Sequence, residues 1–133
     1  MMNREESRER AGTAREHLQV ASERYQYAIA SPGPSPSAQV SASNSILAGI
    51  AAADAIAGVT LGARANDQDH AMAAALLATV LPDGTALAVK LRRLLRDKSL
   101  LQYGGYCTPA KSLEMLKLAS ALVESMDQVH KLS

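Results

Sequence analysis

The eighteen residues from Ile46 to Ala63 constrain the fold of this chain more than any other feature of its sequence. More than half of them are Ala or Gly, and the only charged one, Asp54, lies near the middle. A charge at the centre of a bilayer-spanning helix costs about 2.5–3.5 kcal/mol, and Ala repays little of that cost. We therefore expect a helix that is buried inside a soluble, cytoplasmic protein.

Helix-forming residues dominate the remainder of the sequence. The 133 residues include 25 Ala and 17 Leu, and these residue types lose little free energy on entering a helix. Strand-forming aromatic residues are scarce, since the chain has four Tyr but no Phe and no Trp. The length suits one domain that buries about two-thirds of its unfolded surface. The composition therefore predicts an all-α fold in a single domain.

We expect an up-and-down bundle of about five helices in one domain that spans residues 1–133. Three Pro within residues 31–36 predict a short, stiff linker between the first two helices. Thr108 followed by Pro109 is typical of a helix N-cap and a first helical residue. Apolar residues recur at steps of three and four, which places the helices at about 3–30, 37–64, 70–80, 84–101 and 109–131.

Charge balance and cysteine content exclude several classes of protein. The chain has 14 Lys and Arg against 13 Asp and Glu, and a net charge of +1 gives no overall attraction to nucleic acid or membranes. The single cysteine, Cys107, cannot form an internal disulfide, which fits a reducing cytoplasm and excludes a Cys-rich zinc site. His17, His70 and His130 lie far apart in the sequence, and the glycines form no phosphate-binding loop. We expect neither a metal nor a cofactor.

Two charged residues, Asp54 and Lys98, fall on otherwise apolar stripes of their predicted helices. An unpaired buried charge is too costly to keep, so each one needs a partner. The simplest hypothesis is a structural ion pair between Asp54 and Lys98, with Tyr103 or His70 as secondary partners. A functional site and simple solvent exposure are the alternatives.

A basic patch covers residues Lys90–Lys98 of the predicted fourth helix. It contains five basic residues within nine, with Asp97 as the only acid. Arg92 and Arg96 are four residues apart, so they share the face opposite the Leu stripe. Such a patch can contact the phosphates of a nucleic acid, although a charge run on a helix is usually its solvated face.

The helix order and three short stretches resemble the HEPN superfamily of small helical-bundle proteins. The first stretch is Asp54-Ala-Ile-Ala-Gly in the Ala-rich second helix, and the second is Asp69-His70-Ala at the start of the third. The third is the run from Leu94 to Tyr103, which precedes the last helix. The resemblance covers about residues 5–130.

The resemblance implies a homodimer, because HEPN proteins are typically dimeric, and it directs attention to one motif. Active members are metal-independent ribonucleases with an Arg, four to six residues and then a His before the last helix. In toxins that pair with a minimal nucleotidyltransferase antitoxin, a Tyr follows two residues after the His. Here Arg96 and Tyr103 match the Arg and the Tyr, but Leu101 stands at the His position. Because Leu cannot transfer a proton, the resemblance implies a version of the fold without this catalysis.

The sequence thus favours a binding or regulatory module of a toxin–antitoxin or nucleotidyltransferase-partner system, without catalytic activity. One alternative is a ribonuclease toxin that uses the Arg64–His70 pair, or the Arg96 and Tyr103 site. Another is an RNA- or DNA-contacting protein that uses the basic patch. The candidate binding residues are Arg92, Arg93, Arg96, Lys98, Tyr103 and Tyr106.

Overall fold

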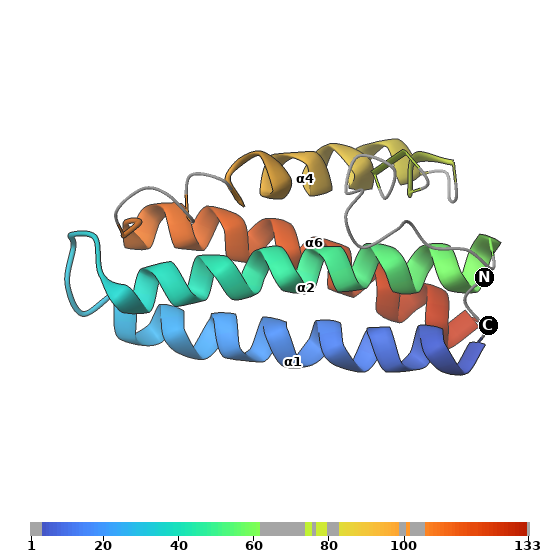
Figure 1. Cartoon of the computed structure of the whole chain (residues 1–133), viewed down its shortest axis with the longest axis horizontal. Helices are drawn as coiled ribbons and strands as arrows, with labels where there is room; N and C mark the ends of the chain where they lie inside the picture. Colours follow the sequence, from blue (N-terminus) through green and yellow to red (C-terminus); the bar gives the residue numbers. More distant parts are fainter. Residues whose placement is uncertain are drawn as a thin grey trace.

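A computed structural model describes residues 4–61, 74–75, 77–79, 83–98, 101 and 106–132 of the chain, and these residues contain helices and connecting segments but no strand. The all-α prediction is confirmed (Figure 1). Helical residues also occur at 74, 75, 77 and 78, within the predicted third helix. The four helices whose bounds are described are α1 (Arg4–Ala28), α2 (Pro36–Leu61), α4 (Gly84–Arg96) and α6 (Pro109–Leu132).

The helices lie side by side with alternating chain direction. α1 and α2 form an antiparallel hairpin, α6 runs in the same direction as α2, and α4 runs opposite to both (Figure 1). α2 packs against each of the other three helices, and α6 does the same. α1 and α4 lie on opposite sides of the α2–α6 pair and do not contact each other within the described residues. α2 and α6 therefore form the centre of the bundle.

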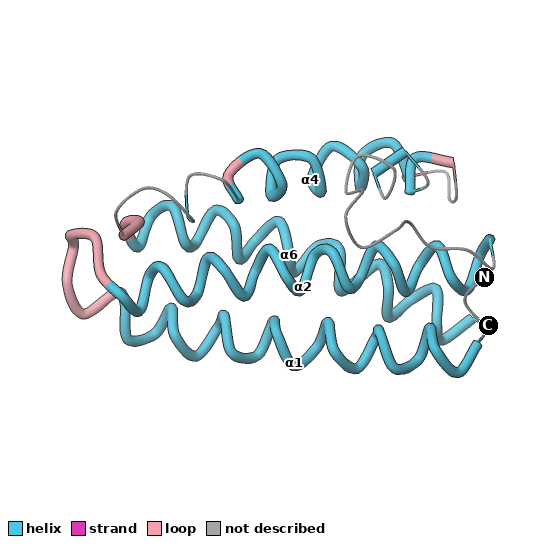
Figure 2. The backbone as a smooth tube through the Cα atoms, viewed as in Figure 1, coloured by secondary structure: helices cyan, strands magenta, loops and turns pink. Residues whose placement is uncertain are grey.

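The two central helices begin with the same local structure. The Ser35 hydroxyl accepts a hydrogen bond from the Ala38 amide at 3.1 Å, and the Thr108 hydroxyl accepts one from the Lys111 amide at 3.2 Å. A Pro follows each capping residue as the first helical residue, where its missing N–H costs nothing. The N-cap predicted at Thr108 is confirmed, and Ser35 is the last residue before α2. Figure 2 shows the linker between α1 and α2 as a loop.

α2 is buried on every side over much of its length. All eight residues from 51 to 58 are buried, and six of them are apolar or Gly residues with little or no side chain to accommodate. By length and composition, Pro36–Gly58 could cross a membrane, but 72% of its most apolar window is covered by the rest of the chain. A helix that is apolar on all faces needs such cover, and neighbouring helices supply it here.

Gly49 shows how closely these helices approach one another. A Cβ atom placed on Gly49 would lie 2.6 Å from Leu94 Cδ1 of α4 and 3.3 Å from Leu122 Cδ1 of α6. Any side chain at residue 49 would force these Leu methyl groups to shift, so Gly49 lets two Leu side chains pack directly on the α2 backbone. Further core residues are the Met and Leu side chains of α6, joined by Ala74 and Leu77 from the predicted third helix.

Candidate functional site

α4 carries three of the residues that the sequence pattern selected, Arg92, Arg93 and Arg96. Its buried face consists of Leu87, Ala88, Leu91 and Leu94, as the apolar spacing predicts. Its other face is basic: Arg92, Arg93 and Arg96 are exposed, Lys90 is half-buried, and no acid occurs between Gly84 and Arg96. A single amphipathic helix thus presents a row of cations at the surface while its leucines anchor it to α2 and α6.

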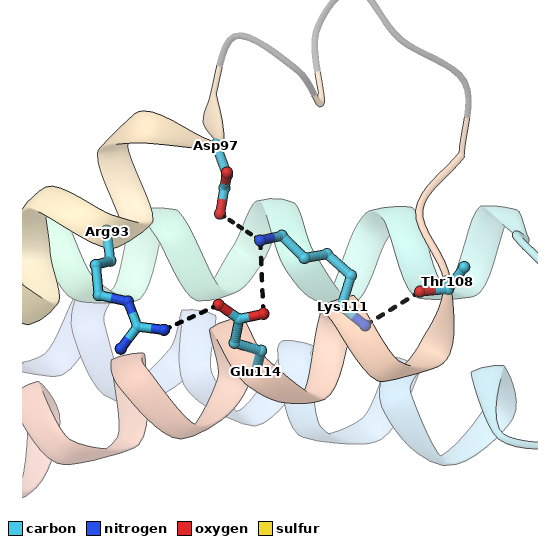
Figure 3. A network of polar contacts seen from close by, with 5 residues as sticks. All are labelled: Arg93, Asp97, Thr108, Lys111 and Glu114. Atoms are coloured by element: carbon cyan, nitrogen blue, oxygen red, sulfur yellow. Dashed lines mark hydrogen bonds and ion pairs between the residues drawn. The ribbon is translucent and has the colours of Figure 1, made fainter.

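A polar network ties the C-terminal end of α4 to the first turns of α6 (Figure 3). Lys111 Nζ lies 2.7 Å from Asp97 Oδ2 and 3.6 Å from Glu114 Oε2. Arg93 Nη2 donates to Glu114 Oε1 at 3.2 Å. The hydrogen bond that Lys111 donates to the Asp97 carboxylate raises the pKa of Lys111, because it stabilises the charged ammonium. Arg93 therefore has a structural partner, whereas no such contact to a described residue engages Arg92 or Arg96.

A small cleft lies between α2 and two residues that follow α4. It has a volume of about 180 Å³ and is lined by Ser43, Ile46, Leu47, Lys98 and Leu101. Leu101 is half-buried and packs against the hydrophobic core. The position at which the HEPN resemblance puts a His is therefore the apolar wall of a cleft, with the ammonium-bearing Lys98 beside it.

Gln39 of α2 contacts two residues that lie between α4 and α6 in the sequence, and no sequence pattern had selected it. Its Nε2 donates to the Leu101 carbonyl at 2.6 Å, and its Oε1 accepts the Cys107 amide at 3.1 Å. One amide from the first turn of α2 thus holds both Leu101 and Cys107. No pattern marks Gln39, because a Gln early in a helix is usually an ordinary solvated residue.

Cys107 lies against the same turn of α2. It is half-buried, and its thiol donates to the Ala38 carbonyl over 3.3 Å. Burial raises the pKa of the Cys107 thiol, because the apolar surroundings disfavour the thiolate. This environment is that of a structural cysteine, not that of an activated nucleophile.

The structure does not bring Asp54 and Lys98 together. Asp54 is 6% exposed and its carboxylate pairs with Arg10 of α1, whose Nη2 lies 3.1 Å from Asp54 Oδ2. Lys98 instead lies beside Ile46 and Leu47. These two residues precede Asp54 on α2 by at least seven residues, or about 10 Å along the helix axis. Because α2 and α4 are antiparallel, the end of α4 meets the first half of α2. Sequence spacing gave no sign of Arg10, which falls in a charge-rich helix.

Three of the remaining candidates, Tyr103, Arg64 and His70, lie outside the described residues. The Arg64–His70 pair and the Arg96–Tyr103 site therefore stay predictions. Tyr106 is 57% exposed, at the entrance to α6.

The other two histidines make contacts far from one another. His17 Nδ1 lies 3.1 Å from Asn44 Oδ1, and His130 Nε2 lies 3.2 Å from the Ala55 carbonyl oxygen. Within the part of the chain that the structure describes, no three His, Cys, Asp or Glu side chains gather into a group that could hold a metal ion.

Comparison with known proteins assigns no relative to this chain. No family model matches it, and no curated protein and no solved structure matches it either. The chemistry of the site therefore rests on the residues described above.

Proposed function

We propose that this chain is a HEPN-like binding or regulatory module without catalytic activity, and that it acts through the C-terminal end of α4. The observation that carries the proposal is Leu101, which stands at the position of the family's His and packs against the core beside Lys98. An aliphatic side chain neither takes nor gives a proton, so acid–base cleavage lacks its essential group there. The same side chain supplies an apolar wall, which suits a binding cleft.

A ribonuclease assay in metal-free buffer tests the absence of catalysis. We expect the purified chain to leave a mixed-sequence RNA intact, because no proton-transfer group stands at residue 101. Arg96→Ala and His70→Ala variants are assayed beside it. Cleavage that persists in Arg96→Ala but disappears in His70→Ala would replace this proposal with the Arg64–His70 ribonuclease.

The resemblance adds two expectations about partners, a homodimer and a nucleotidyltransferase-type protein. Light scattering on the purified chain measures the first, and a mass of one chain across the accessible concentration range would rule it out. For the second, we expect a small nucleotidyltransferase gene beside the gene for this chain. Co-expression of the two products followed by size-exclusion chromatography then shows whether they form a complex.

Nucleic-acid contact is the second candidate, favoured by the exposure of Arg92 and Arg96 on a helix that has no acidic residue. Binding through phosphates predicts an affinity that falls as the salt concentration rises. Each lost phosphate contact reduces the slope of log K against log salt concentration by about 0.7–0.9. Arg92→Gln and Arg96→Gln should each reduce the slope for RNA in fluorescence anisotropy. Arg8→Gln, at an exposed position of α1, is the matched control and should leave it unchanged.

A further inference from the structure

The first half of α2 exposes aliphatic side chains between α1 and α4. Val40 and Leu47 are 42% and 43% exposed, although most of α2 is buried. They are seven residues apart, so they lie on the same face of the helix, about two turns from each other. We call this surface, together with the adjoining cleft of Ser43, Ile46, Lys98 and Leu101, the α2 face.

No charge interrupts the α2 face on α2 itself, since α2 has no charged residue before Asp54. Its edges are cationic. Lys98 lines the cleft at the α4 edge. Arg93 of α4 and Asp97, the residue that follows α4, contact α6. Arg92 and Arg96 each precede one of them by one position, so they lie about 100° further round the helix axis, away from α6.

The α1 edge carries one cation, Arg24. His17 contacts Asn44, which lies between Val40 and Leu47 on α2, and Arg24 follows seven residues later on the same face of α1. Arg24 is stacked over the ring of the exposed Tyr27 at 4.5 Å. The acids Glu16 and Glu23 precede His17 and Arg24 by one residue each. Their side chains therefore leave α1 about 100° further round the helix axis than those of His17 and Arg24.

An uncharged aliphatic strip between two cationic edges complements an amphipathic acidic helix. We propose that the α2 face binds such a helix of a partner protein. The aliphatic side chains of the partner helix pack on Val40 and Leu47 and enter the cleft, and its carboxylates face Lys98, Arg92 and Arg96. A second copy of this chain is a poorer match, because it would set cations against cations. This inference rests on the proposed function and specifies its partner.

A synthetic helical peptide with Leu on one face and Glu beside it is the probe. Its binding to the full chain is measured by fluorescence anisotropy, with a peptide that has Lys in place of Glu for comparison. We expect the Glu peptide to bind and the Lys peptide to bind about tenfold more weakly or not at all. Equal binding of the two peptides, or no binding of the Glu peptide, would overturn the proposal.

Two substitutions of similarly exposed residues locate the site. Leu47→Glu should weaken the binding of the Glu peptide about tenfold, because the substitution adds a like charge and removes an apolar contact. Ser120→Glu, at an exposed position of α6 in the groove between α6 and α1, should leave the affinity unchanged. Equal effects of the two variants would contradict the α2 face as the site, and circular dichroism verifies that both are folded.

The other occupants of the α2 face give distinct results. A dimer of the chain that dissociates in Leu47→Glu would identify a second copy and overturn the proposal. Displacement of the peptide by mixed-sequence RNA, with Leu47→Glu without effect, would reduce the surface to a polyanion site and overturn it as well. RNA cleavage by the unmodified chain would defeat the proposed function alone, because peptide binding is measured independently of it.

Discussion

α2 and α4 join the same core by opposite means. α2 has almost no large side chains in its buried half and lets its neighbours approach its backbone, as Gly49 does with Leu94 and Leu122. α4 inserts four apolar residues from one face and leaves a basic face in solvent. The contrast separates two roles: α2 sets the spacing of the bundle, while α4 carries the charge by which the surface can recognise a partner. Substitutions at the contact between the two helices test this separation.

The largest effect is expected for Leu94→Ala. Leu94 is fully buried against Gly49, and truncation of such a residue leaves a cavity that costs about 3 kcal/mol of unfolding free energy. Urea unfolding followed by circular dichroism measures the change. Val89→Ala on the exposed face of α4 should stay within about 0.5 kcal/mol. Similar losses for both would mean that α4 is not anchored through its Leu stripe.

The ion pairs between α4 and α6 are expected to differ in strength with their burial. Lys111→Met leaves the Asp97 carboxylate, which is 8% exposed, without its cation and should cost about 2 kcal/mol. Arg93→Met removes a pair whose side chains are 46% and 40% exposed, and it should cost less than about 1 kcal/mol. The same urea titration compares them, and a reversed order would show that burial does not govern this network.

The close approach at Gly49 predicts a non-additive pair of substitutions. Gly49→Ala should cost about 1–2 kcal/mol, because the new Cβ forces Leu94 and Leu122 to shift. In a Leu94→Ala background that contact is absent, so the cost should fall by about 1 kcal/mol in a double-mutant cycle. Additive effects would mean that Leu94 does not limit the approach.

Gly12→Ala is the matched control for Gly49→Ala. It lies within α1, and a Cβ placed there meets nothing within 4 Å. The loss of backbone entropy in the unfolded chain should make the variant more stable by about 0.5–1 kcal/mol. Destabilisation at both glycines would point to a general intolerance of Ala and not to close packing at Gly49.

The smallest effect concerns alkaline pH. The folded-state pKa of Lys111 lies above 10.5, so its contribution to stability is complete below that pH and is lost as the pH rises through the folded value. Cys107 also has a raised pKa in the folded chain, so its thiol ionises more readily in the unfolded chain and stability falls in the same direction as the pH rises above 9.0. Urea midpoints measured from pH 8 to 11 should fall, and they should fall less in Lys111→Met and in Cys107→Ala. If the urea midpoints of both variants fell with pH as steeply as those of the unmodified chain, neither Lys111 nor Cys107 would be the cause of the fall.

Local patterns in the sequence predicted the helices well. The start at Pro109 and the starts near residues 37 and 84 agree with the structure within about one residue, because caps, prolines and apolar spacing act within a few residues. The apolar spacing of the last helix agrees with the structure as well, since Met115, Leu122 and Met126 are fully buried.

The candidate site was predictable only in part. The basic row of α4 follows from spacing alone, and the structure exposes Arg92, Arg93 and Arg96 accordingly. Sequence spacing could not show that Glu114 forms an ion pair with Arg93, nor that Gln39 forms hydrogen bonds with both Leu101 and Cys107. These contacts join residues between 21 and 68 positions apart, and their existence depends on which helices become neighbours.

By itself the sequence determined that the chain is helical, where its main helices begin, and that its Ala- and Gly-rich segment must be covered. These are consequences of local propensity and of the cost of exposing apolar surface or burying an isolated charge. Only the tertiary structure decided which cation meets Asp54. Arg10 and Lys98 are both compatible with a buried carboxylate, but the antiparallel arrangement places Lys98 beside the first half of α2 and leaves Arg10 within reach. The same arrangement exposed Val40 and Leu47 between cationic edges, because α1 and α4 cover opposite sides of α2 without meeting.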